Sequence, residues 1–138
     1  VECTKDYHKD TVSLISPMDY AICWGDVPVM AKYMKFSQYG RFANYTYDLN
    51  SPVDPKYVVS HMSNNHLIPA NSNIRRSLGY AKKGNKVIVD GFLVNVTGSK
   101  PGRGTFHWNT SLKREDYGDG ACEIIYVTKL RINDKVYE

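Results

Sequence analysis

The strongest β-strand signal in this chain is the segment Lys86-Val87-Ile88-Val89-Asp90-Gly91-Phe92-Leu93-Val94-Asn95-Val96. Its apolar side chains fall on both faces of an extended backbone, which is typical of a strand that is covered on both sides. The pattern therefore predicts a central strand over residues 86–96. A glycine inside a strand often marks a β-bulge or a bend, so we expect one at Gly91.

A second long strand is predicted near the carboxyl end of the chain. If residues 121–132 are extended, Ile124, Tyr126, Leu130 and Ile132 lie on one face of the strand. Charged residues occupy positions on the opposite face. The segment is therefore predicted to run through the sheet as its last long strand.

Shorter strands are predicted on the amino-terminal side. Residues 20–24 are rich in strand-forming types, and the run ends at Gly25-Asp26. Residues 34–47 contain Gly40 between two stretches rich in aromatic residues. This pattern predicts either two antiparallel strands or one sharply bulged strand.

Two short helices are predicted in the middle of the chain. The first begins at Asp54-Pro55, where the aspartate is an N-cap and proline suits the first helical position. The second is capped by Ser72 or Asn73. Apolar residues then recur at helical spacing in residues 74–81, and Gly84 ends the element.

Together these elements predict a mainly β domain with two short helices, of the α+β class. Five or six strands and two helices in this order fit a small closed or partly open β-barrel with an OB-like arrangement. The 138 residues suit a single globular domain over residues 1–138. Hydrophobic residues make up 42% of the chain and charged residues 23%, a composition that can build a core.

The distribution of charged residues bears on whether the chain binds nucleic acid. The formal net charge is +4, but the basic residues form only short clusters, with acidic residues interspersed elsewhere. A nucleic-acid-binding surface is therefore not indicated. No apolar run approaches the roughly 20 residues that span a bilayer. Because the sequence begins at Val1 rather than Met, it is consistent with a signal peptide or membrane anchor upstream that processing has removed.

The three cysteines are Cys3, Cys23 and Cys122, so at most one internal disulfide can form. A bond between Cys23 and Cys122 would close a loop of about a hundred residues and contribute on the order of 4 kcal/mol through chain entropy. The alternative is three reduced thiols, with Cys23 and Cys122 buried as small apolar side chains. No Cys-x-x-Cys pair occurs, so the cysteines do not predict a zinc site.

The most unusual segment is His61-Met62-Ser63-Asn64-Asn65-His66-Leu67-Ile68-Pro69-Ala70-Asn71. Its many amides and imidazoles predict an Ω-like loop at the rim of the sheet. There His61 and His66 could act as a general base or bind a metal, with Asn64 and Asn65 as hydrogen-bond donors. The alternative is that these side chains only hydrogen-bond the backbone of their own loop. The His-Glu-x-x-His pattern of zinc proteases is absent.

A second group of reactive side chains lies in residues 108–123, where a hydroxyl, a guanidinium, four carboxylates and a thiol fall within the 13 residues from Ser111 to Glu123. Asp116 and Asp119 could bind a hard cation, although the order of residues is not that of a calcium loop. The alternative is a glycine-rich turn in which Arg114 pairs with a carboxylate. Cys122 would act as a nucleophile only with a histidine beside it.

Three segments resemble an uncharacterised family of bacterial proteins that are exported or membrane-anchored. They are Asp19-Tyr20-Ala21-Ile22-Cys23-Trp24-Gly25, residues 60–70 and residues 114–127. The resemblance covers much of the chain. It implies a periplasmic or otherwise extracytoplasmic location, and it carries no known activity, so it assigns no role to any residue.

The leading functional hypothesis is a binding module without enzymatic activity. Tyr, Trp and Arg are abundant, and these residue types dominate binding surfaces. The expected partner is an unidentified protein or small ligand, and no metal or cofactor is predicted. The residues expected to contact the ligand are His61, Asn64, Asn65, His66, Trp108, Arg114 and Asp116.

Two alternatives come from other functional classes. One is a hydrolase in which His61 or His66 acts as the base, Arg114 stabilises an anion and Asn65 orients the substrate. The other is a single-stranded nucleic-acid-binding domain, suggested by the OB-like arrangement and the aromatic content.

Overall fold

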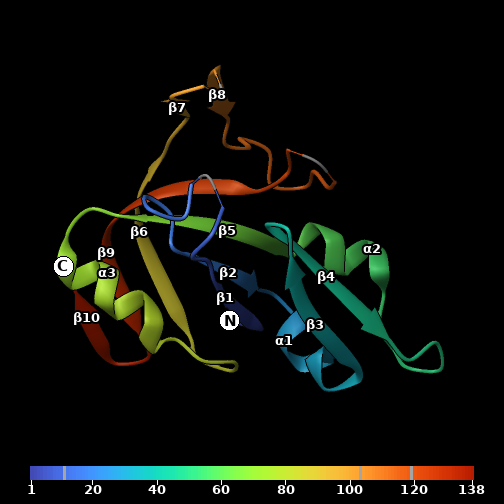
Figure 1. Cartoon of the computed structure of the whole chain (residues 1–138). Coiled ribbons are helices and arrows are strands. Elements are labelled where there is room, and N and C mark those ends of the chain that lie inside the picture. Colours follow the sequence, from blue (N-terminus) through green and yellow to red (C-terminus); the bar gives the residue numbers. More distant parts are fainter. Residues whose placement is uncertain (11, 103, 119) are drawn as a thin grey trace.

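The computed structural model describes residues 1–10, 12–102, 104–118 and 120–138 (Figure 1). Strands make up most of its regular structure, which confirms the mainly β prediction. The strands are β1 (Cys3–Asp6), β2 (Met18–Cys23), β3 (Met34–Tyr39), β4 (Phe42–Tyr47), β5 (Met62–Pro69), β6 (Val87–Leu93), β7 (Val96–Lys100), β8 (Gly104–Trp108), β9 (Glu123–Ile132) and β10 (Lys135–Tyr137). The helices are α1 (Val27–Met30), α2 (Pro55–Ser60) and α3 (Ser72–Ser77), and two 3₁₀ turns are η1 (Ala31–Tyr33) and η2 (Leu78–Tyr80).

Within the described residues, six strands form one sheet. Its order is β1-β2-β5-β9, with β6 on the far side of β9 and β10 beside the last part of β9. β5 and β9 run parallel, and the other neighbours are antiparallel. β3–β4 and β7–β8 form separate hairpins, and Figure 1 shows β7–β8 extending beyond the sheet. No closed barrel is found in these residues, so the barrel and OB-like prediction is not confirmed.

The strand predicted at the centre of the sheet lies at its edge. Among the described residues β6 pairs only with β9, whereas β9 has neighbours on both sides. Val87 and Val89 pack against the core, and Ile88 between them is exposed. The apolar run over residues 86–96 therefore reflects one covered face and an exposed apolar face, not burial on both faces.

The bulge predicted at Gly91 is confirmed. The register of β6 against β9 shifts between Asp90 and Gly91, so that Thr128 is passed over in the pairing. A Cβ atom at position 91 would collide with the carbonyl oxygen of Tyr126. Only glycine allows the two backbones to approach this closely without rearrangement.

The same bulge changes which side chains of β9 share a face. Val127, Leu130 and Ile132 belong to one buried cluster, and Ile125 packs against it. Strict alternation predicts instead that Ile124 and Tyr126 lie with Leu130 and Ile132. That prediction is wrong because the extra residue at position 128 reverses the phase of the strand.

One face of the sheet, which we call the α3 face, is covered by α3 over only part of its area. Ile74, Leu78 and Ala81 pack there against Tyr20 and Leu67, as their helical spacing predicts. Asn71 caps the helix, because its side chain accepts a hydrogen bond from the Ile74 amide at 2.9 Å. The cap thus lies one residue before Ser72, the first of the two predicted candidates, and the helix begins at Ser72.

The opposite face, which we call the hairpin face, is covered by β3–β4 together with α1 and α2. Val27, Met34, Val53 and Val58 form a second buried apolar cluster there. Asp54 caps α2 as predicted. The short α1 was not predicted, since its Val-Pro-Val sequence favours an extended turn. No helix of the described residues is long and apolar enough to cross a membrane.

The amide-rich segment is not the predicted loop at the rim. Residues 62–69 form β5, which is hydrogen-bonded to β2 on one side and β9 on the other. Asn64, Asn65 and His66 are buried within it. Polarity predicted solvent exposure, but pairing on both sides satisfies the backbone, and buried partners satisfy the side-chain amides of Asn64 and Asn65.

Gly91→Ala should lower the free energy of unfolding by about 2–4 kcal/mol, because the added methyl group forces β6 away from β9. The matched control is Gly79→Ala. A Cβ atom at Gly79 meets no atom within 4 Å, so this change should stay within about 1 kcal/mol. Urea denaturation followed by circular dichroism measures both. Equal effects of the two changes would contradict the assigned role of Gly91.

Candidate functional site

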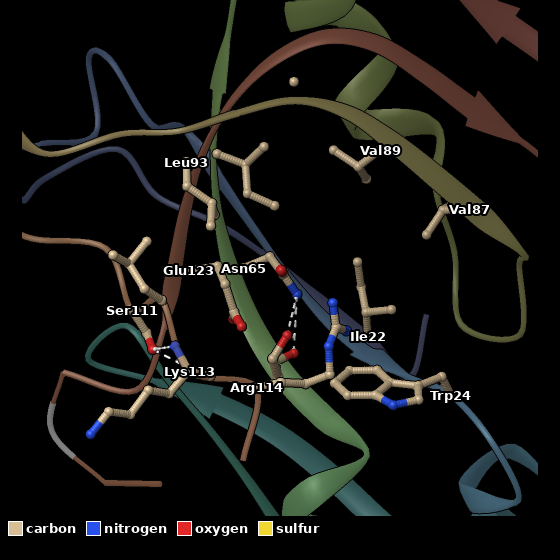
Figure 2. Close-up of a pocket in the computed structure, with 14 residues that line it drawn as sticks. Ile22, Trp24, Asn65, Val87, Val89, Leu93, Ser111, Lys113, Arg114 and Glu123 are labelled. Carbon is tan, nitrogen blue, oxygen red and sulfur yellow. Dashed lines mark hydrogen bonds between the residues drawn. The ribbon is translucent and has the colours of Figure 1, made fainter. Parts of the chain in front are cut away.

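A cavity of about 460 Å³ opens on the part of the α3 face that the helix leaves uncovered. We call it the open-face cavity. Figure 2 shows its lining side chains. They come from β2 and the residue after it, from β5, β6 and β9, and from the loop after β8: Ile22, Trp24, Ser63, Asn65, Val87, Val89, Gly91, Leu93, Ser111, Leu112, Lys113, Arg114, Glu123 and Ile125.

The alternation of the strands determines which side chains reach this cavity. In β5, Ser63 and Asn65 face it, while Asn64 points to the opposite face of the sheet. In β9, Glu123 lies directly across from Asn65 in the parallel pair. The sheet therefore places an amide and a carboxylate side by side at the base of the cavity.

Glu123 carries the least satisfied group in this region. Its Oε2 atom is buried and has no hydrogen-bond partner among the described residues. Burial raises the pKa of its carboxyl above the ordinary value, against the lowering effects of the Ser63 hydroxyl and the Arg114 guanidinium. A buried acceptor without a donor is costly and is uncommon in folded proteins.

Asn65 is held rigidly beside this carboxylate. Its Nδ2 donates to the Ser63 Oγ at 2.9 Å, to the Ser63 carbonyl at 3.2 Å and to the Tyr20 carbonyl at 3.3 Å. Only 5% of the residue is exposed. These bonds fix the amide, so that its orientation does not depend on a ligand.

Arg114 reaches the cavity from the loop after β8, and hydrogen bonds between residues of this loop hold it in place. The Ser111 hydroxyl donates to Asp116 Oδ2 at 2.6 Å and accepts from the Lys113 amide at 3.0 Å. The Arg114 guanidinium lies 5.5 Å from the Trp24 ring centre, a distance suited to a cation–π contact. Asp116, predicted to bind ligand, therefore helps to hold the loop that carries Arg114.

A second polar cluster lies on the hairpin face, around the fully buried Asp19. The guanidinium of Arg41 donates from Nη1 to Asp19 Oδ1 at 2.8 Å. It also binds both carboxylate oxygens of Asp10, at 2.6 and 2.9 Å, and the Ser16 carbonyl at 2.9 Å. The Arg41 hydrogen bond holds the pKa of Asp10 below its ordinary value. This arginine joins the amino-terminal loop to the sheet.

Arg41 occupies an uncommon backbone conformation. It follows Gly40 in the β3–β4 turn, and both residues have positive φ, 57° at Gly40 and 71° at Arg41. A two-residue turn of this kind favours Gly or Asn at both positions. The four hydrogen bonds of the guanidinium compensate for a conformation that a long side chain rarely adopts.

His66 completes the cluster. Its Nδ1 lies 2.9 Å from Asp19 Oδ1, but the N–H does not align with that oxygen, so the contact is close without being a hydrogen bond. Its ring packs 4.7 Å from the Trp108 ring. Both side chains line a cavity of about 320 Å³ that Cys122 also borders. Burial raises the pKa of the Cys122 thiol to about 11, which disfavours a reactive thiolate.

His61 belongs to neither cluster. It follows α2 and stacks on Tyr57 with ring centres 3.8 Å apart. Its Nδ1 is 2.9 Å from both the Ser60 Oγ and the Tyr57 carbonyl oxygen. This nitrogen is therefore already occupied by groups of the helix itself, as expected for a structural histidine.

The structure thus divides the predicted site residues between two faces. Asn65 and Arg114 line the open-face cavity, whereas Asn64, His66 and Trp108 belong to the hairpin face. The predicted hydrolase groups His66 and Arg114 are consequently not brought together. Cys3, Cys23 and Cys122 are free thiols. Asp119 lies outside the described residues, and within them no group of three His, Cys, Asp or Glu is placed to hold a metal ion.

Sequence reasoning missed Asp19, Arg41 and the central role of Glu123. Asp19 carries a signal in hindsight, since it is a charged residue at the start of an apolar strand. Glu123 was included only as one carboxylate of the cluster in residues 108–123. Arg41 gave no signal, because nothing in a Gly-Arg turn indicates that its side chain reaches a strand more than 20 positions away.

Arg41→Lys should lower the free energy of unfolding by about 3 kcal/mol, because an ammonium cannot bridge Asp10, Asp19 and Ser16 and leaves the buried Asp19 poorly paired. Arg131→Lys, on the exposed side of β9, is the control and should change stability by less than about 0.5 kcal/mol. Chemical denaturation compares them. A tolerated lysine at position 41 would show that the guanidinium geometry is not required.

Glu123→Gln should stabilise the domain at pH 8. A carboxyl whose pKa is raised in the fold disfavours folding once it is ionised, and this cost disappears as the pH falls below the ordinary glutamate value. The advantage of the variant should therefore shrink between pH 8 and pH 4, as measured by urea denaturation. Glu115→Gln at an exposed position should show no such trend. A pH-independent effect at position 123 would refute the burial argument.

Comparison of the chain with protein-family models, with curated proteins and with solved structures finds no match. The functional argument therefore depends on the geometry of the two polar clusters. In the Asp19 cluster the Asp19 carboxylate is paired with Arg41 and Asn64, although the buried Ser16 Oγ and His66 Nδ1 lack hydrogen-bond partners among the described residues. The open-face cavity is lined by Glu123, a carboxylate that forms no ion pair in the described part of the chain and has one unpartnered buried oxygen.

Proposed function

We propose that this domain is a non-enzymatic binding module that holds a small polar organic ligand in the open-face cavity. The observation that carries the proposal is the Glu123 side chain, which lines the cavity and whose buried Oε2 has no hydrogen-bond partner among the described residues. A ligand that donates a hydrogen bond to this carboxylate would reduce the cost of burying it unpaired. The free-energy cost of the unpaired carboxylate is present in the ligand-free domain and decreases when the ligand binds.

The rest of the cavity has the composition of a ligand site. Its volume of about 460 Å³ lies within the range of small-molecule pockets. One side is apolar, formed mainly by Val87, Val89 and Leu93 of β6. The other side presents Asn65, Arg114 and Glu123. A few fixed polar groups opposite an apolar wall orient a ligand while burial supplies affinity.

Binding is better supported than hydrolysis. The hydrolase hypothesis needs a histidine base and Arg114 at one substrate, but His66 lies on the opposite face and His61 is stacked on Tyr57. The nucleic-acid hypothesis drew on an OB-like barrel, and an open sheet provides less support for it. An extracytoplasmic bacterial location belongs to the proposal as well, supported by the resemblance of the three segments.

The test is a ligand screen by NMR on ¹⁵N-labelled protein with mixtures of small polar metabolites. Binding in the open-face cavity should shift the amide signals of Gly91, Leu93 and Ile125, and Glu123→Gln should reduce the affinity at least tenfold. Glu115→Gln is the matched control and should bind as the wild type does. Ligands that shift only residues around Trp108, or that bind the Glu123 variant equally well, would overturn the proposal.

A further inference from the structure

Two groups of opposite charge face the interior of the open-face cavity. Figure 2 shows the Glu123 carboxylate and the Arg114 guanidinium both directed into the region beside Asn65. Among the described residues neither group forms an ion pair with the other or with a third side chain. They lie close enough for the guanidinium to lower the pKa of the carboxyl. The cavity therefore presents one negative and one positive group that are both available to a ligand.

Lys113 does not change this balance. Lys113 borders the cavity, but Figure 2 shows that its ammonium group points away from Glu123 and Arg114. A ligand in the cavity thus meets a single carboxylate and a single guanidinium, and charge complementarity favours a ligand with one cationic and one anionic group.

Resting on the function proposed above, we infer that the open-face cavity binds an α-amino acid with a large apolar side chain. The ammonium group of the ligand donates to the Glu123 carboxylate, and the ligand's own carboxylate accepts from the Arg114 guanidinium. Charge-assisted hydrogen bonds of this kind are about twice as strong as neutral ones. A ligand with only an anionic group would be repelled by Glu123, and one with only a cationic group would be repelled by Arg114.

The apolar wall selects the side chain of the ligand. Val87, Val89 and Leu93 of β6 line the cavity with Ile125 of β9. Burying a large aliphatic or aromatic side chain against them favours binding, because apolar surface is removed from water. A small or charged side chain would gain little from this wall. The inference is therefore restricted to amino acids such as phenylalanine and leucine.

A carbohydrate fits the same cavity less well. Sugar rings stack on open aromatic faces, and Trp24 is the only aromatic residue of the described cavity lining. The Arg114 guanidinium already lies over its ring. A neutral sugar would also leave both charged groups without a charged partner. The zwitterion satisfies both at once.

Isothermal titration calorimetry with three ligands of matched shape tests the inference. The ligands are L-phenylalanine, phenethylamine, which lacks the carboxylate, and hydrocinnamate, which lacks the ammonium. L-Phenylalanine should bind at least tenfold more tightly than either of the others. If phenethylamine or hydrocinnamate binds as tightly as phenylalanine, a zwitterion is not what the cavity recognises.

Two variants assign each charge to its group. Glu123→Gln should weaken phenylalanine and phenethylamine at least tenfold without weakening hydrocinnamate, whereas Arg114→Gln should weaken phenylalanine and hydrocinnamate without weakening phenethylamine. Glu115→Gln and Arg131→Gln are the exposed controls and should leave all three affinities unchanged. Equal losses for all ligands in both variants would reflect a general loss of the cavity and would overturn the assignment.

The outcome separates this inference from the function on which it rests. If the NMR screen finds ligands in the open-face cavity while phenylalanine and leucine do not bind, the amino-acid inference fails and the binding module stands. If no compound shifts Gly91, Leu93 and Ile125, both fail. Both the amino-acid inference and the binding module are supported if phenylalanine binds, if Glu123→Gln weakens only the two ligands with an ammonium group, and if Arg114→Gln weakens only the two ligands with a carboxylate.

Discussion

The backbone pairing of β9 is the constraint on which the rest of the structure depends. This strand is hydrogen-bonded to β5 on one side and to β6 on the other, and its last residues also pair with β10. The pairing with β5 places Glu123 beside Asn65, and the pairing with β6 forms the apolar wall opposite them. A single strand thus positions both sides of the open-face cavity, and the close approach at Gly91 fixes its register.

Successive side chains of β5 point to opposite faces of the sheet, which separates its polar residues into two groups. The two groups differ in how fully their surroundings are hydrogen-bonded. Asn64 and His66 face Asp19, where Arg41 and its partners satisfy most of the buried charge. Asn65 faces the other way and lies beside the Glu123 carboxylate, one oxygen of which has no donor among the described residues. The first group behaves as a structural anchor, since the Asp19 carboxylate is bound by Arg41 and Asn64. In the second group, the Glu123 carboxylate can still accept a hydrogen bond, as a binding site requires.

Much of the local structure could be predicted from sequence. The capped start of α2, the apolar face of α3, the turn at Gly40 and the bulge at Gly91 depend on residues close together in the chain. The errors concern partners distant in sequence. Residues 62–69 are polar yet central, because strands from both ends of the chain pair with them. The site could be predicted only as separate segments that contain Asn65, Arg114 and Glu123.

The sequence by itself determined a β-rich single chain with defined caps and turns, and it identified the segments that contain the polar residues of interest. Only the tertiary structure decided that β6 is an edge strand, that Arg41 reaches Asp19, and that Asn65 and Arg114 are separated from His66 by the sheet. The physical reason is that propensities and caps act over a few residues, whereas strand order and register are decided by the burial of side chains brought together from the whole chain.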